Sequence, residues 1–147
     1  MTIPSQKLIY IATAIAIVVT VLWAVLFVPR LDRHPEAVKD GAADSSRTFF
    51  RFLLAATVVL LACAILSQLG GRIINGVITA LLYFAAGLLF FHDFMGFNGA
   101  VYYLQEYEGF SMEAILMLIC AGANLIAAIL AIKAGNKYRH LALPRDS

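Results

Sequence analysis

Ionisable side chains are missing from four long stretches of this sequence, and this absence narrows the choice of function. The stretches contain no Asp, Glu, Lys, Arg or His, although the chain carries 11 basic and 9 acidic residues in all. Proton-coupled transporters usually hold an ionisable group within the membrane, and haem-binding bundles need histidine ligands there. The sequence therefore argues against both of these classes.

Cysteine and glycosylation signals are scarce as well. Cys63 and Cys120 are the only cysteines, and each falls inside an apolar run. Their separation excludes a Cys-x-x-Cys redox pair, so both are expected to act as small buried hydrophobes. None of the four Asn residues begins an Asn-x-Ser/Thr sequon. The net charge of +2 is too small to indicate a nucleic-acid partner, so none is expected.

What the sequence has in excess is apolar residues. The chain is 62% hydrophobic and 14% charged, whereas soluble domains are about half apolar and about a quarter charged. A bilayer core about 30 Å thick is crossed by a helix of about 20 apolar residues, and each of the four stretches meets that length. The expected organisation is a single transmembrane domain with spans and connections at 8–28 (first span), 29–47 (outer loop), 48–69 (second span), 69–72 (tight inner turn), 73–92 (third span), 93–111 (outer loop), 112–133 (fourth span) and 134–147 (cytoplasmic tail).

The connections predict how the spans are arranged. Leu69-Gly-Gly-Arg72 is so short that the second and third spans must be antiparallel neighbours. Each outer loop has a pattern that favours a short helix, one beginning at Pro35 and one over 100–107. Ser46 is expected to cap the second span. The predicted fold is an all-α integral membrane four-helix bundle of two antiparallel transmembrane hairpins, with a short interfacial helix in each outer loop.

Basic residues indicate the orientation of the spans. The side with both ends of the sequence and the tight turn carries six basic residues, and the other side carries four, or five with Arg51. The second outer loop has none. Because Lys and Arg accumulate on the cytoplasmic side, both termini are expected in the cytoplasm, and a bacterial inner membrane fits the small chain best. The first span is too long for the core of a signal peptide and is expected to be retained.

Aromatic residues gather at the outer end of the bundle. Most of the 10 Phe, the 6 Tyr and the single Trp map to the outer helix ends or the second outer loop, which is more than an interfacial belt needs. One interpretation is a lid that buries its rings on the helix ends and pairs its acids with arginines of the first loop. The other is a docking surface for a membrane partner. The partner-binding residues would be Phe94, Phe97, Tyr102, Tyr103, Tyr107 and Phe110.

Acidic residues and a histidine share this outer region. Carboxylates and imidazole are metal ligands, so these residues form a candidate cation site, although their spacing matches no defined motif. The alternative is a set of solvated or ion-paired acids at the interface, with bound lipid as the only expected cofactor. The candidates are His92, Asp93, Glu106, Glu108 and Glu113.

Small and mildly polar residues recur along the third and fourth spans. Small residues spaced by four let helix backbones approach closely, and Asn in lipid usually bonds across helices. We expect these positions to pack helices together, within this chain or against a partner. They are Gly76, Ala80, Ala123, Asn124, Ala127, Ala131 and Gly135.

These features favour a non-catalytic accessory subunit of a larger membrane complex, which binds membrane lipids and other integral membrane subunits or a second copy of itself. A small homo-oligomeric transporter or channel is the alternative, with Thr79, Tyr83 and Asn124 along a polar path. A third hypothesis is an enzyme at the outer interface that uses His92 and a nearby carboxylate. No spacing in the sequence defines a reaction, so no catalytic residue is assigned.

Overall fold

Every element in the described part of the chain is helical. The computed structural model describes residues 5–108 and 112–143, without the side chains of Ala37, Tyr103, Leu104, Tyr107, Glu108 and Glu113. Four apolar helical segments are long enough to cross a membrane, which confirms the predicted all-α membrane bundle. Their ranges are Ser5–Asp32, Ala42–Leu66, Arg72–Tyr102 and Ala114–Ala142.

Two of these segments contain a π-helical stretch that joins two α-helices. The first span runs through η1 and the third runs through η2. In chain order the elements are α1 (Ser5–Leu22), η1 (Trp23–Phe27), α2 (Val28–Asp32), α3 (Pro35–Lys39), α4 (Ala42–Leu66), α5 (Arg72–Phe91), η2 (His92–Phe97), α6 (Asn98–Glu108) and α7 (Met112–Ala142).

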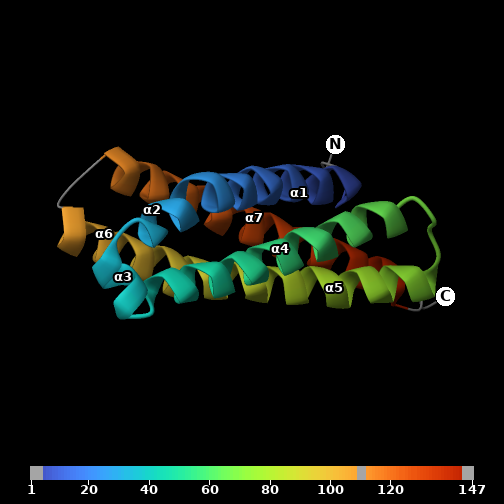
Figure 1. Cartoon of the computed structure of the whole chain (residues 1–147). Helices are drawn as coiled ribbons and strands as arrows, with labels where there is room; N and C mark the ends of the chain where they lie inside the picture. Colours follow the sequence, from blue (N-terminus) through green and yellow to red (C-terminus); the bar gives the residue numbers. More distant parts are fainter. Residues whose placement is uncertain (1–4, 109–111, 144–147) are drawn as a thin grey trace.

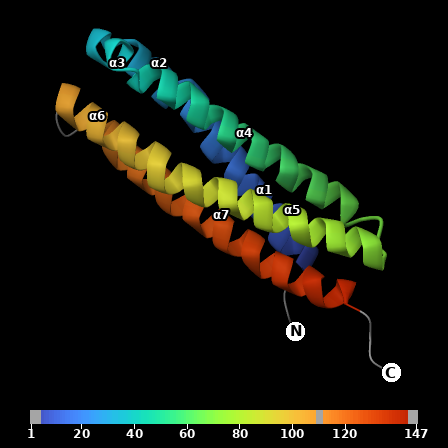
Figure 2. The same cartoon turned by 90° about the horizontal axis from the view of Figure 1, so that it is seen from below.

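The long helices form an elongated antiparallel bundle (Figures 1 and 2). α1 packs beside α4 and α7, and α5 also packs beside α4 and α7, so the four neighbours close a ring. The start of α1, the α4–α5 turn and the end of α7 lie at one end of the bundle, while α2, α3 and α6 lie at the other (Figure 1). We call these the inner end and the outer end, after the orientation that the sequence predicts.

Two glycines shape the turn at the inner end. The chain reverses between Leu66 and Arg72, where Gly70 and Gly71 adopt φ angles of 75° and 105°. Glycine takes up such positive φ angles without the steric penalty that a Cβ atom brings. The turn therefore holds α4 and α5 as the antiparallel neighbours that the short connection predicted.

Small residues bring α7 against α5 over the inner half of the bundle. Ala127, Ala131 and Gly135 are buried. A Cβ atom at Gly135 would lie only 2.9 Å from Cε1 of Tyr83, closer than such atoms can approach. This part of the predicted small-residue face packs the two helices of one chain.

The other members of that predicted set lie differently. Ala80 is exposed, and Ala123 and Gly76 are half-buried. A Cβ atom at Gly76 would meet only Cβ of Ala142, at an ordinary distance of 3.9 Å. The periodicity of small residues therefore predicted close packing on α7 better than it did on α5.

Two helix starts differ from the prediction. α4 begins at Ala42, after Gly41 with its φ of 84°, so Ser46 lies inside the helix and does not cap it. α6 continues α5 through η2 with no break, and the Asn98 amide donates a 2.7 Å hydrogen bond back to the Phe94 carbonyl oxygen. The Asn98 side chain thus bonds back along a continuous helix and does not start a new one.

The fourth span is longer than its apolar stretch. α7 continues to Ala142, nine residues beyond the predicted end at position 133. Ala134 and Tyr138 are buried on this extension. Their contacts with the bundle keep the predicted tail helical, because packing of a helix face stabilises a helix more than propensity does.

Candidate functional site

The two π-helical segments meet at the outer end of the bundle. The rings of Trp23 and Phe27, from η1, lie 5.1 and 6.4 Å from the ring of Phe97, from η2, and both pairs are edge-to-face. A π-helical turn carries an extra residue in the hydrogen-bond ring and often marks a functional site. The extra residue rotates the following side chains, and here it turns aromatic rings of two spans toward one another.

His92 lies at the centre of this aromatic cluster. Its ring is fully buried, and its centroid lies 4.6 Å from Trp23, 4.9 Å from Phe97 and 5.7 Å from Phe49, each edge-to-face. Gly96 makes room for it, because a Cβ atom there would lie 3.1 Å from Nε2 of His92. Burial of a polar ring among apolar ones is costly unless its nitrogens are hydrogen-bonded.

The buried polar atoms that lack a hydrogen-bond partner gather at this same level. In residues 5–108 and 112–143, five such side-chain atoms belong to Ser46, His92, Asp93 and Asn124. Trp23 contacts both Ser46 and His92. Its indole N–H donates a 2.9 Å hydrogen bond to the Ser46 carbonyl oxygen, and its ring packs on His92. Each unpartnered group costs about 1–3 kcal/mol, and such groups call for an explanation in a native protein.

Asp93 and Asn124 form the other half of this polar group. The Asn124 side chain is fully buried, donates a 2.8 Å hydrogen bond to the Leu89 carbonyl oxygen and interacts with the Asp93 carboxyl group. Asn124 lies in the middle of the uncharged stretch of α7. His92 and Asp93 lie inside the continuous helical segment Arg72–Tyr102 and not at its end.

The predicted cation site is not assembled by the side chains that can be placed. Among the described residues, no group of three His, Cys, Asp or Glu side chains could hold a metal ion. His92 faces rings of α4 and η1, whereas Asp93 faces Asn124 of α7. Glu106 is exposed, and the side chains of Glu108 and Glu113 lie outside the described set.

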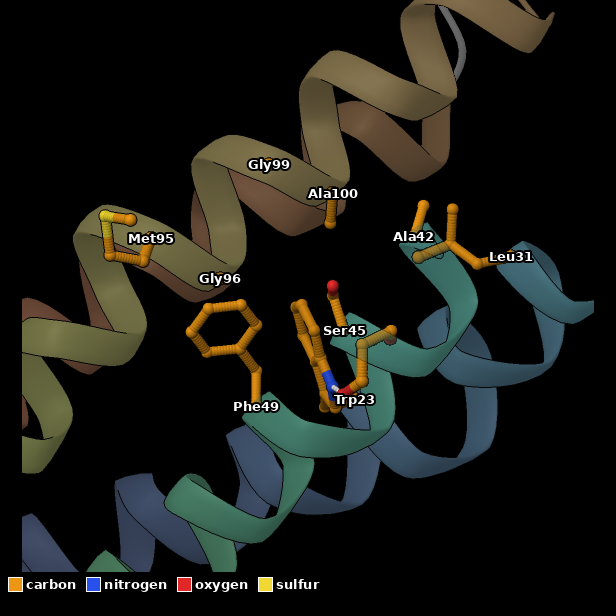
Figure 3. Close-up of a pocket in the computed structure, with 10 residues that line it drawn as sticks. Trp23, Leu31, Ala42, Ser45, Phe49, Met95, Gly96, Gly99 and Ala100 are labelled. Atoms are coloured by element: carbon orange, nitrogen blue, oxygen red, sulfur yellow. Dashed lines mark hydrogen bonds between the residues drawn. The ribbon is translucent and has the colours of Figure 1, made fainter. Parts of the chain in front are cut away.

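A pocket lies directly beside the aromatic cluster (Figure 3). Its volume is about 290 Å³, and it separates the first turns of α4 from η2 and α6. In Figure 3 the rings of Trp23 and Phe49 point up toward the helix that carries Gly96, Gly99 and Ala100. The remaining lining residues are Leu31, Ala42, Ser45, Ser46 and Met95.

The predicted partner-binding aromatics divide between surface and core. Phe94 and Tyr102 are 60% and 62% exposed. Phe97 is 1% exposed and belongs to the core, so it is not available to a partner. The side chains of Tyr103 and Tyr107, and all of Phe110, lie outside the described part. Arg47 of α4 pairs with Asp32 of α2 and Asp44 of α4 at 2.7 and 2.9 Å, and not with an acid of the second outer loop.

Sequence reasoning missed several residues of this site. The sequence predicts Ser46 as a helix cap, and it places Gly96 and Gly99 in the second outer loop. The signal that could have found them is the small-xxx-small spacing of Gly96 and Ala100, which marks close approach of helices. It was overlooked because the third span was expected to end at 92.

Comparisons with known proteins find no family to which this chain is similar. A scan against models of protein families and searches among curated proteins and solved structures each find no match for the chain. The fold defines the class as a four-helix integral membrane protein, and the function is argued from the chain's own residues.

Proposed function

We propose that the chain is a non-catalytic accessory subunit of a larger membrane complex, which docks a partner on one face of its third span. The observation that carries this proposal is a row of large exposed side chains along α5, η2 and α6. We call it the exposed aromatic face, and it consists of Phe84, Phe91, Phe94, Met95 and Tyr102, each 45–62% exposed.

The spacing and the chemistry of this face both support docking. Steps of three, four and seven residues keep the side chains on one side of a helix. Exposed residues on the other spans are mostly aliphatic, such as Val25 and Val58, as expected of surfaces that meet lipid tails. Phe, Tyr and Met are enriched at protein interfaces, so the aromatic face is the best candidate for a protein partner.

The polar-path alternative has less support. Thr79 Oγ1 donates a 2.8 Å hydrogen bond to the Asn75 carbonyl oxygen of its own helix, and Tyr83 donates to the side chain of Asn136. Asn124 is held by Leu89. A path for a solute needs polar groups that turn to a shared cavity, and neither pocket described between the helices is lined by these residues.

The enzyme alternative has less support for a different reason. A general base needs contact with substrate, and His92 is fully enclosed by aromatic rings. We therefore keep the accessory-subunit proposal, with the cytoplasmic termini and the bacterial inner membrane as part of it. Membrane lipids would cover the remaining aliphatic faces.

Site-specific photocross-linking in native membranes tests this proposal. A photoreactive phenylalanine analogue replaces Phe94, and in a matched control it replaces Val58, which is 56% exposed on α4. We expect a discrete cross-linked partner protein from position 94 and lipid adducts alone from position 58. Identical products from both positions, or a cross-linked dimer of this chain as the only protein product, would contradict the accessory-subunit proposal.

A further inference from the structure

The pocket beside His92 has the shape and lining of a site for a flat ring. Trp23 and Phe49 supply aromatic surfaces on one side, and the backbone at Gly96 and Gly99 supplies a surface with no side chains on the other (Figure 3). The volume of about 290 Å³ exceeds the cavity of about 150 Å³ that holds benzene in an engineered protein. A substituted ring therefore fits.

Ser46 offers this pocket a hydroxyl that the fold does not use. Hydroxyls inside helices usually bond back to the carbonyl oxygen four residues earlier, and those of Thr13, Thr20, Thr57 and Thr79 all do so at 2.7–2.9 Å. The Ser46 Oγ atom is buried, lines the pocket and has no such partner. It is a donor available to an acceptor atom of a ligand.

A second polar group lies behind Gly96. The position that a Cβ atom would occupy there is 3.1 Å from Nε2 of His92 and 3.2 Å from Cγ of Phe49. This is hydrogen-bond distance from an imidazole nitrogen that has no partner among the described residues. The same position is also close to Phe49, and His92 is fully buried and does not line the pocket, so this nitrogen stays enclosed and Ser46 is the buried polar group that the pocket offers to a ligand.

The lining residues also exclude two classes of ligand. None of the ten lining residues is charged, so the pocket offers no Lys or Arg to a phosphate head group. A saturated acyl chain would leave the Ser46 hydroxyl without a partner. Met95, 56% exposed, and the exposed Ser45 lie at the rim, so the site is reached from the side of the bundle.

We propose that this pocket binds the uncharged carbonyl-bearing ring of a membrane-soluble amphiphile, of the quinone class. The ring lies between the aromatic side chains and the glycine backbone, and a carbonyl oxygen of the ring accepts a hydrogen bond from the Ser46 hydroxyl. The apolar tail of the amphiphile passes Met95 into the lipid. This site shares only Met95 with the exposed aromatic face, and its binding of a ligand can be tested without a protein partner.

The chain carries its own reporter for this site, because Trp23 is the only tryptophan and lines the pocket. The full chain is reconstituted in phosphatidylcholine nanodiscs and titrated with decylubiquinone, which quenches tryptophan emission on contact. We expect saturable quenching with a defined Kd. Dioleoylglycerol and phosphatidylglycerol, titrated as competitors, are expected to leave that Kd unchanged. Displacement by either one would overturn the assignment to a quinone ring.

Two pairs of variants test the site itself. Gly99→Leu fills the pocket, and a Cβ atom at Gly99 meets nothing within 4 Å, as is also true of the control Gly87→Leu on the exposed side of α5. We expect Gly99→Leu to abolish saturable quenching and Gly87→Leu to preserve it. Quenching that is linear in the native protein, or equal in both variants, would show partitioning of the quinone into lipid and would overturn the proposal.

The folding of Gly99→Leu is checked by its elution in size-exclusion chromatography and by its tryptophan emission maximum. If this variant folds poorly, the second pair of variants still tests the proposal. Ser46→Ala removes the unpartnered hydroxyl and is expected to raise the Kd about tenfold, as for one lost hydrogen bond. Thr48→Ala, which removes an exposed hydroxyl of α4 outside the pocket lining, is expected to change the Kd less than about twofold. An unchanged Kd in Ser46→Ala would overturn the assigned role of this hydroxyl and with it the proposed geometry.

Discussion

The inner and outer halves of the bundle are built on different principles. The inner half consists of regular α-helices held by small residues, and its polar side chains are paired, as between Gln6 and Ser67 at 3.2 Å. The outer half contains both π-helical segments, the aromatic cluster and every buried unpartnered polar atom of the described residues. Unpartnered polar groups lower stability, and the ligand pocket proposed above would give one of them, the Ser46 hydroxyl, a partner.

Trp23 belongs both to the aromatic cluster of the outer half and to the lining of the pocket. Its replacement should lower the free energy of unfolding more than the other substitutions do. Trp23→Ala removes a fully buried ring that contacts Phe27, His92 and Phe97. We expect a loss of about 3–5 kcal/mol, as for other buried Trp or Phe truncations. Thermal unfolding in mild detergent measures it. A loss below about 1 kcal/mol would mean that the aromatic cluster does not hold the outer ends of the spans together.

Close packing of α7 on α5 defines the inner half, and Gly135→Ala should disrupt it. The new Cβ atom would lie 2.9 Å from Cε1 of Tyr83, and overpacking of this kind costs about 1–3 kcal/mol. The control is Gly122→Ala on the same helix, where a Cβ atom meets nothing within 4 Å. Since Ala favours a helix by about 1 kcal/mol over Gly, the control should unfold at an equal or higher temperature. Equal behaviour of the two variants would refute the close contact.

Two glycines of the site allow the same comparison in the outer half. A Cβ atom at Gly96 would lie 3.1 Å from Nε2 of His92, whereas one at Gly99 meets nothing within 4 Å. Gly96→Ala should cost about 1–2 kcal/mol, and Gly99→Ala should be neutral or stabilising. Thermal unfolding of both variants, in parallel with the inner pair, shows whether His92 is held in place. Stabilisation by Gly96→Ala would contradict the position given to His92.

Sequence reasoning reached the outline of the fold because the outline depends on local signals. Hydropathy predicted the four spans, and the Gly70–Gly71 pair predicted the tight turn. The burial of His92 could not be predicted, since it follows from η2, and a π-helical turn leaves no signature in residue type. The same turn moved Phe97 from the expected surface into the core. The helix continues past His92 and Asp93 through η2 and α6, which the charge pattern did not indicate because these two residues resemble the end of a span when only the sequence is considered.

The sequence places most aromatic residues at the outer end, and the pocket and the aromatic cluster lie there. The binding role of this end stays a prediction. The residues that form the pocket come from α4 and the first span as well as from the second outer loop. Contacts between distant segments, such as Trp23 with Ser46, are set by packing and cannot be read from either segment alone.

The central proposal is that the unpartnered Ser46 hydroxyl serves binding and does not hold the fold. Thermal unfolding of Ser46→Ala beside Thr57→Val in ligand-free protein tests it most directly. The Thr57 hydroxyl is paired with Leu53 and Thr20, so Thr57→Val should cost about 0.5–1.5 kcal/mol. Ser46→Ala is predicted to unfold at the native temperature or above it. A loss of stability in Ser46→Ala equal to that of Thr57→Val would contradict the account.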